Sequence, residues 1–260
     1  MSDPVLDAMR AMANEKAAAA RSDLAATGLV KVYGDRTVVS GISMHCSCGE
    51  IVGILGTNGA GKTSTFYMIV GLVRPEAGKV EFRGTDITGL PVYKRARMGL
   101  GYLAQEASVF RKLTVWENVM AILETLPLGR RERAARAEEL LAPFDLMKVA
   151  KQPAYTLSGG ERRKLEIARA LVRRPAILML DEPFAGVDPL SVSEIQDIVR
   201  GLAQKGLGIV ITDHNVRETL SVVNRASLVY DGRLLREGSS EELVSDPEVR
   251  EKYLGENFRM

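Results

Sequence analysis

Residues 51–63 read Ile-Val-Gly-Ile-Leu-Gly-Thr-Asn-Gly-Ala-Gly-Lys-Thr, an apolar run followed by a glycine-rich loop. The apolar run predicts a buried strand, and residues 63–70 predict a helix. The glycines let backbone amides turn towards phosphate oxygens, and the helix N-terminus attracts the same anions. Lys62 adds a mobile positive charge, and the Thr63 hydroxyl is a candidate magnesium ligand. This order of strand, loop and helix predicts a nucleotide-binding α/β protein.

A second apolar run, residues 177–180, ends in Asp181 and Glu182 and is stopped by Pro183. Open α/β sheets bind their ligands at the carboxyl ends of strands, so both acids are expected near the phosphates. Successive side chains diverge at a strand end, and we therefore expect Asp181 to hold magnesium, usually through water, and Glu182 to orient and deprotonate the attacking water. Alone, the pair could be a chance turn. After a phosphate loop, it favours ATP hydrolysis.

The sequence Ser158-Gly159-Gly160-Glu161 has the spacing of a capping box, which predicts a helix that continues to Val172. The Ser158 hydroxyl and the free amides of this turn form a second candidate anion site. The chain thus has two phosphate-binding helix ends and one evident nucleotide loop. A head-to-tail pair of subunits would use both, because the second site of each subunit closes over the γ-phosphate bound by the other.

Composition is that of a globular protein without a strong charge bias. The 260 residues, 46% of them hydrophobic, suffice for a buried core, and the net charge of +2 gives no argument for a nucleic-acid partner. No apolar stretch approaches the roughly 18 to 20 residues that cross a bilayer, and no secretory signal is visible, so we expect a cytoplasmic protein. Cys46 and Cys48 follow His45, but these three groups leave a tetrahedral metal site incomplete, which favours a structural role.

Strands that alternate with helices predict a largely parallel sheet covered on both faces. Residues 1–25 are expected to be a flexible extension, residues 26–240 the main domain, and residues 241–260 a C-terminal helical tail. Within the main domain, residues from about 107 to 172 are expected to form a helical subdomain. After the strand that ends at the two acids, Ser191 is expected to open the next helix, because Glu194 follows at capping-box spacing.

From Leu29 to Ser240 these motifs together resemble the ATP-binding cassette (ABC) ATPases. The resemblance implies a P-loop core with a mainly parallel sheet, an antiparallel β subdomain and a helical subdomain, with ATP and Mg²⁺ as cofactors. It also implies that residues 157–161 are the family signature, although Glu161 stands where many members carry Gln. Glutamate preserves the helix cap and leaves the phosphate contacts to Ser158 and Gly160.

The resemblance assigns three sets of residues. The nucleotide is expected at Tyr33, Gly56, Thr57, Asn58, Gly59, Ala60, Gly61, Lys62, Thr63, Ser64, Ser158, Gly159 and Gly160, with Tyr33 stacking on adenine. The catalytic residues are Gln105, Glu182 and His214, the magnesium ligands are Thr63, Gln105 and Asp181, and Asp188 resembles the loop that communicates across the dimer. Taken alone, Tyr33, Gln105 and His214 are ordinary strand and loop residues, and only their order relative to the strong motifs favours these roles.

The motor subunit of a membrane transporter is the favoured class, because hydrolysis motifs are present and no membrane-crossing element is. Soluble mechanical ATPases compete, but their relatives carry long coiled coils or two cassettes, and neither is seen. A structural module without turnover is disfavoured by the complete catalytic set. Within transporters, residues 105–119, 212–219 and 253–259 resemble the ATPases of lipopolysaccharide exporters. The alternative is the ATPase of a branched-chain amino-acid importer, which shares much of the core.

The closer resemblance implies a homodimer beneath two transmembrane permease subunits, with membrane association through these partners only, at the cytoplasmic face of the inner membrane. Phe110 and Arg111 are expected to help form a groove for a coupling helix of the permease. For Phe110 the alternative is packing within the helical subdomain. The extension over residues 1–25 departs from the shorter exporter pattern.

Overall fold

The computed structural model describes residues 22–255 and residue 258, so the expected extension over residues 1–25 lies almost entirely outside the described residues. The first strand, β1, begins at Leu24, two residues before the expected start of the main domain. Leu24 is itself buried, so the packed core already includes it. No helix among the described residues is long and apolar enough to span a membrane.

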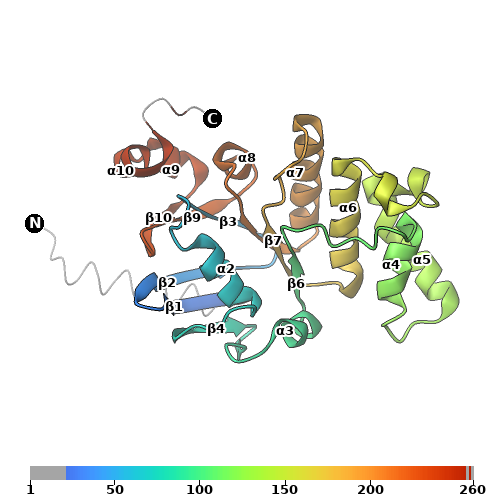
Figure 1. Cartoon of the computed structure of the whole chain (residues 1–260), viewed down its shortest axis with the longest axis horizontal. Helices are drawn as coiled ribbons and strands as arrows, with labels where there is room; N and C mark the ends of the chain where they lie inside the picture. The colour runs from blue at the N-terminus through green and yellow to red at the C-terminus, as the bar shows by residue number, and fades with distance from the viewer. Residues whose placement is uncertain (1–21, 256–257, 259–260) are drawn as a thin grey trace, which may run out of the picture.

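The strands of the described residues form two sheets (Figure 1). An antiparallel sheet has the order β2-β1-β4-β5, and a mainly parallel sheet has the order β10-β9-β3-β8-β7-β6, in which β10 runs antiparallel to β9. The strands are β1 Leu24–Tyr33, β2 Arg36–Cys46, β3 Ile51–Gly56, β4 Ala77–Phe82, β5 Thr85–Asp86, β6 Leu100–Leu103, β7 Ile177–Asp181, β8 Gly208–Thr212, β9 Arg225–Tyr230 and β10 Arg233–Gly238. The predicted fold class is confirmed.

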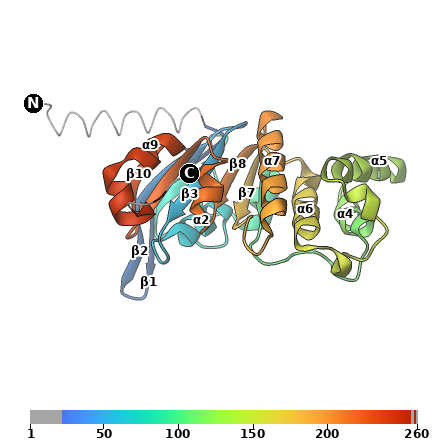
Figure 2. The same ribbon diagram turned by 90° about the horizontal axis from the view of Figure 1, so that it is seen from above.

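The helices gather on the faces of the parallel sheet and beyond its β6 edge. They are α2 Lys62–Val70, α3 Val92–Met98, α4 Val115–Leu123, α5 Arg130–Leu141, α6 Gly159–Ala170, α7 Pro189–Gln204, α8 Val216–Leu220, α9 Ser240–Ser245 and α10 Pro247–Val249, with short turns η1 Ala142–Phe144, η2 Leu146–Val149, η3 Ala154–Thr156, η4 Leu171–Arg173 and η5 Arg250–Leu254. Both views place α4 and α5 at the opposite end of the molecule from β1 and β2, with α6 and α7 between (Figures 1 and 2).

The centre of the parallel sheet is its most buried part. Every residue of β3, β7 and β8 is buried, which fits their continuous apolar sequences, because both faces of a parallel sheet are covered. In the strand register, Thr212 of β8 lies opposite Ile54 on one side and Asp181 on the other. The phosphate loop after β3, the acids after β7 and the residues after β8 therefore meet at one edge of the sheet.

Helix α7 begins earlier than expected, and the prediction that Ser191 opens it was wrong. Pro189 occupies the first turn, and the Asp188 side chain caps the helix by accepting a hydrogen bond from the Ser191 amide at 3.0 Å. Aspartate is as good a cap as serine, and proline at the first helical position has a backbone angle that suits the helix. The Asp-Pro pair is therefore the stronger start signal.

Candidate active site

The phosphate loop, residues 56–63, is folded around its glycines. Gly56, Gly59 and Gly61 all have positive φ angles, of 153°, 76° and 103°. A Cβ atom on Gly56 would lie 2.1 Å from the Val229 carbonyl oxygen, so this glycine is required by the close approach of β9 as well as by its backbone angle. The result is a tight turn that ends at the N-terminus of α2.

Lys62 lies over this turn. Its ammonium group donates to the carbonyl oxygens of Gly56 at 2.7 Å and Thr57 at 2.9 Å. Burial lowers the pKa of Lys62, and the nearby Glu182 carboxylate acts in the opposite direction. The ammonium therefore lies in the loop where phosphate oxygens are expected, and in this structure two backbone carbonyl groups accept hydrogen bonds from it.

The three predicted catalytic residues come together. Glu182 follows β7 in a left-handed backbone conformation, with φ 45°, and its amide donates to the Thr212 carbonyl at 2.7 Å. Glu182 Oε2 accepts a hydrogen bond from Gln105 Nε2 at 2.7 Å and lies 3.2 Å from His214 Nδ1. One carboxylate oxygen is thus shared by an amide from the loop after β6 and an imidazole from the loop after β8.

Asp181 differs from its neighbour in its surroundings. Its side chain is 2% exposed, and no Lys or Arg among residues 22–255 lies within ion-pair distance of it. Burial is the largest influence on Asp181 and raises the pKa of its carboxyl group. A buried carboxylate without a cationic partner suits a bound cation. The described residues hold no cluster of three or more His, Cys, Asp or Glu that could bind a metal by themselves. Magnesium, however, commonly uses one or two carboxylates together with phosphates and water.

The predicted signature turn, residues 158–160, opens α6 as expected. Ser158 Oγ accepts from the Glu161 amide at 3.1 Å, and Glu161 Oε2 accepts from the Ser158 amide at 2.9 Å, which confirms the capping box. Gly160 is buried against α7, where an added Cβ would lie 2.3 Å from Ser191 Oγ. Within the described residues, no hydrogen bond or ion pair joins this turn to the phosphate loop, so one chain does not bring its two anion sites into contact.

The sequence did not indicate a buried ion pair, Arg163–Glu166, that links α6 to the end of β7. Arg163 of α6 donates to the carbonyl oxygens of Asp181 at 3.0 Å and Glu182 at 3.2 Å, and it pairs with Glu166 at 3.0 Å. Further hydrogen bonds reach Pro183 and Ala104. The other Glu166 oxygen accepts from the Ser108 amide at 3.0 Å. The only sequence signal was the Arg-Glu spacing of three within a helix, which is also common on solvated surfaces.

Tyr33 lies apart from the catalytic residues, near the end of the antiparallel sheet. Its ring is 49% exposed, and the Lys31 ammonium lies 5.0 Å from the ring centroid. Lys31 also forms an ion pair with Glu76 at 2.7 Å. The ring that is expected to stack on adenine is therefore half-exposed, and the positively charged Lys31 lies beside it.

Phe110 is 48% exposed, and its ring lies under the Arg169 guanidinium at 4.6 Å. The fully buried Asn118 holds the loop from within: its Oδ1 accepts from the Phe110 amide at 2.8 Å, and its Nδ2 donates to the Phe110 carbonyl at 3.0 Å. The Arg111 carbonyl accepts from the Tyr155 amide at 3.1 Å. The chain thus fixes this loop so that the Phe110 side chain faces outwards.

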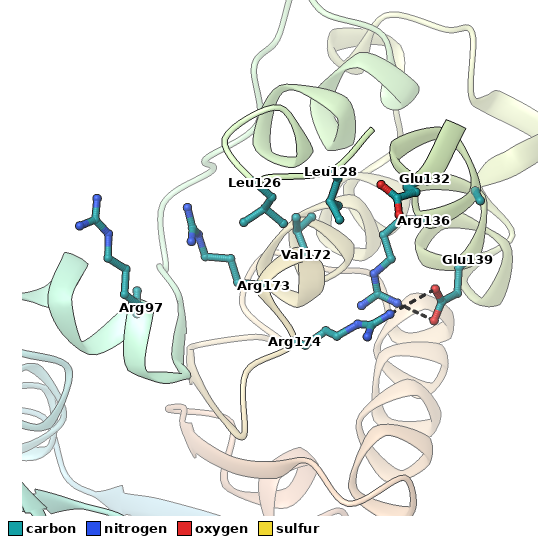
Figure 3. A pocket seen from close by; sticks show the side chains of 11 residues that line it. Arg97, Leu126, Leu128, Glu132, Arg136, Glu139, Val172, Arg173 and Arg174 are labelled. Atoms are coloured by element: carbon teal, nitrogen blue, oxygen red, sulfur yellow. Dashed lines mark ion pairs between the residues drawn. The ribbon is translucent and has the colours of Figure 1, made fainter. Parts of the chain in front are cut away.

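A cavity of about 480 Å³ lies elsewhere, between α3, the connection from α4 to α5, α5 and η4 (Figure 3). Leu126, Leu128 and Val172 form its apolar part. Arg136 and Arg174 both pair with Glu139, while Arg97 and Arg173 extend from α3 and η4 on the other side (Figure 3). None of the residues expected to bind nucleotide lines this cavity, so it is separate from the site described above.

Comparisons with known proteins identify the family of this chain. A family model described as "ABC transporter" matches residues 39–185. The lipopolysaccharide export system ATP-binding protein LptB of Acidithiobacillus ferridurans is 54% identical over 91% of this chain and 98% of its own length. LptB of Escherichia coli strain K12 is 50% identical over 91% of this chain and 99% of its own length.

Among solved structures, the ADP conformation of an ATP-binding cassette of an ABC transporter has a TM-score of 0.80 and 28% identity, and the alignment covers 90% of this chain and 98% of that one. A cbiO1 subunit from Clostridium perfringens, part of an ABC transporter complex, gives a TM-score of 0.80 and 28% identity over 89% of this chain and 94% of that one. The chain belongs to the ABC transporter family, as a subunit that binds and hydrolyses ATP.

Proposed function

We propose that this chain is the ATP-hydrolysing motor of a lipopolysaccharide exporter. The observation that carries the proposal is the identity of 50–54% to proteins named LptB, which extends over about nine-tenths of the chain and nearly the whole of each relative. The stretches whose sequence resembles this group, residues 105–119 and 212–219, carry Gln105, Phe110 and His214. The branched-chain amino-acid importer is the less favoured candidate.

In the proposed mechanism, Glu182 is the base that takes a proton from the attacking water. In the structure Gln105 and His214 both contact one oxygen of this carboxylate, Glu182 Oε2. Binding of ATP is expected to draw His214 away from Glu182 towards the γ-phosphate, and Gln105 would turn towards the metal that it is expected to hold. Glu182 Oε2 would then be free to accept a proton from the attacking water once the triphosphate is in place.

Lys62 is proposed to exchange its two carbonyl contacts for phosphate oxygens, with residues 56–64 donating backbone amides and Tyr33 stacking on adenine. Thr63, Gln105 and Asp181 would hold Mg²⁺, for which the buried carboxylate of Asp181, without an ion pair among the described residues, is suited. When bound, magnesium neutralises charge on the triphosphate during phosphoryl transfer. In this proposal the residues of one chain would provide every expected contact except those of the signature turn.

The signature turn supports a proposed homodimer. Ser158 is exposed at the start of α6 and makes no contact with the phosphate loop of its own chain. In a head-to-tail pair, Ser158, Gly159 and Gly160 of one subunit would donate to the γ-phosphate held by the other. ATP then joins the two subunits, and hydrolysis separates them because the γ-phosphate contacts vanish.

We further propose that two permease subunits like LptF and LptG are the membrane partners. A groove that includes Phe110 and Arg111 would receive a coupling helix, supported by the half-exposed Phe110 ring on a loop that Asn118 holds rigidly. The dimer would lie at the cytoplasmic face of the inner membrane through these partners. In this proposal, residues 26–240 form the ATPase domain, with a helical subdomain from about 107 to 172.

Affinity isolation of the full chain from native membranes, followed by mass spectrometry of associated proteins and lipids, tests the proposal. Co-purification of two permeases of the LptF and LptG type, with lipopolysaccharide, is the expected result. Recovery of amino-acid permease subunits would favour the importer, and recovery of ribosomes would favour a soluble mechanical ATPase. A matched isolation with Phe110→Ala separates partners held through the groove from background.

A further inference from the structure

Two tyrosines outside the expected nucleotide site converge on the Asp181 carboxylate. Tyr102 lies on β6, and its hydroxyl donates to Asp181 Oδ2 at 3.5 Å. Tyr67 lies on α2, five residues after Lys62; burial raises the pKa of its hydroxyl most, and the same carboxylate is near enough to raise that pKa further. The carboxylate thus meets one hydroxyl from the helix that begins with Lys62 and one from the strand that leads to Gln105.

Packing fixes both tyrosine rings. The fully buried Phe66 packs against both, with its ring centroid 6.4 Å from that of Tyr67 and 6.2 Å from that of Tyr102. In the parallel pairing of β6 with β7, Tyr102 lies opposite Met179, two residues before Asp181. The rings therefore have a packing role, and their hydroxyl groups are left to face the carboxylate.

A phenol hydroxyl can donate one hydrogen bond and accept others. Each tyrosine can therefore donate to Asp181 and also accept from a water molecule bound to a nearby cation. Magnesium keeps several of its waters when it binds at a nucleotide site. The observed 3.5 Å is the outer limit of a hydrogen bond, and contacts of this kind commonly tighten when substrate is bound.

We propose that Tyr67 and Tyr102 are positioning residues that orient the Asp181 carboxylate towards hydrated Mg²⁺. The inference rests on the proposed role of Asp181 as a magnesium ligand. Among residues 22–255 no Lys or Arg forms an ion pair with the Asp181 carboxylate, so its hydrogen-bonding neighbours are expected to determine how its oxygens point. Removing partners that orient a metal-binding group typically lowers metal affinity by about 10- to 100-fold.

The test is a double variant, Tyr67→Phe with Tyr102→Phe, which keeps both rings and removes both hydroxyls. The variant is made in the full chain with Glu182→Gln, so that ATP binding can be measured at equilibrium. Titration calorimetry gives the Kd of ATP with excess Mg²⁺ and again with a chelator. Tyr93→Phe is the matched control, because Tyr93 is 55% exposed on α3 and lies outside the site.

For the double variant we expect the Kd of Mg²⁺-ATP to rise about tenfold, while the Kd of metal-free ATP stays the same. Tyr93→Phe should change neither Kd. An unchanged Kd for Mg²⁺-ATP, or an equal rise in both Kd values, would overturn the positioning role. If the parent Glu182→Gln chain binds ATP equally well with and without Mg²⁺, the proposed magnesium site itself is wrong.

Discussion

Replacing Glu166 by Gln should destabilise the protein strongly, because the change breaks a buried ion pair. The side chains of Arg163 and Glu166 are 7% and 3% exposed, and their closest atoms lie 3.0 Å apart. Gln keeps the shape and can still accept from the Ser108 amide, but the charge opposite the guanidinium is lost. Removing one partner of such a pair costs about 3–5 kcal/mol, since the remaining charge is uncompensated. Arg163 keeps its carbonyl acceptors in the variant, so we expect the loss of unfolding free energy to lie at the lower end of this range, about 3 kcal/mol.

Urea unfolding followed by circular dichroism measures this loss as a lower midpoint with an unchanged slope. For a chain of this size the same loss lowers Tm by roughly 6–12 °C. Glu194→Gln is the matched control, because Glu194 is 48% exposed and pairs with Lys164 at 2.5 Å on the surface between α6 and α7. An exposed pair contributes only about 0–1 kcal/mol. If Glu166→Gln lowers the free energy of unfolding no more than Glu194→Gln does, the buried ion pair does not stabilise the protein as proposed.

Three further predictions concern separate parts of the chain. Gly160→Ala would place a Cβ 2.3 Å from Ser191 Oγ, so we expect ATPase activity to fall roughly tenfold or more. Adding Ser191→Gly removes the clashing side chain and should restore part of the activity. If the double variant is no more active than Gly160→Ala alone, the steric cause is refuted. Thiol titration of the native chain should modify the exposed Cys48 and spare the buried Cys46. Partial burial raises the pKa of Cys48, so the rate at which it is labelled should keep rising above pH 9.0. Rapid labelling of both thiols in the native chain would contradict the structure. Phe110→Ala should weaken co-purification with permease subunits and leave ATP affinity unchanged, and undiminished co-purification would argue against the groove.

The parts of the fold that the sequence predicts well are those encoded by neighbouring residues. Residues 51–63 contain a strand, a glycine loop and a helix start in succession, and the structure has all three in that order. The capping box at Ser158 and Glu161 is equally local and was predicted correctly. The antiparallel sheet was expected only from the family resemblance, because strands such as β1 and β4 pair across about fifty residues.

Contacts between distant residues could not be predicted from the pattern. Arg163 lies in a run of charges that usually marks a solvated helix face, yet it donates to the carbonyl groups of Asp181 and Glu182 at the end of β7. Tyr102 and Asp181 are 79 residues apart, and only the pairing of β6 with β7 brings them together. In both cases a polar side chain finds its partners through sheet order, which local periodicity does not determine.

The mass of the Glu182→Gln chain in the presence of Mg²⁺-ATP tests the central claim most directly. Light scattering should give twice the 28.4 kDa of one chain with Mg²⁺-ATP and a single chain without nucleotide. Adding Ser158→Arg should abolish the dimer while each chain still binds ATP, because the arginine side chain fills the signature turn that contacts the other subunit's nucleotide. A monomer with Mg²⁺-ATP bound, or a dimer that Ser158→Arg leaves intact, would contradict a nucleotide shared between two subunits.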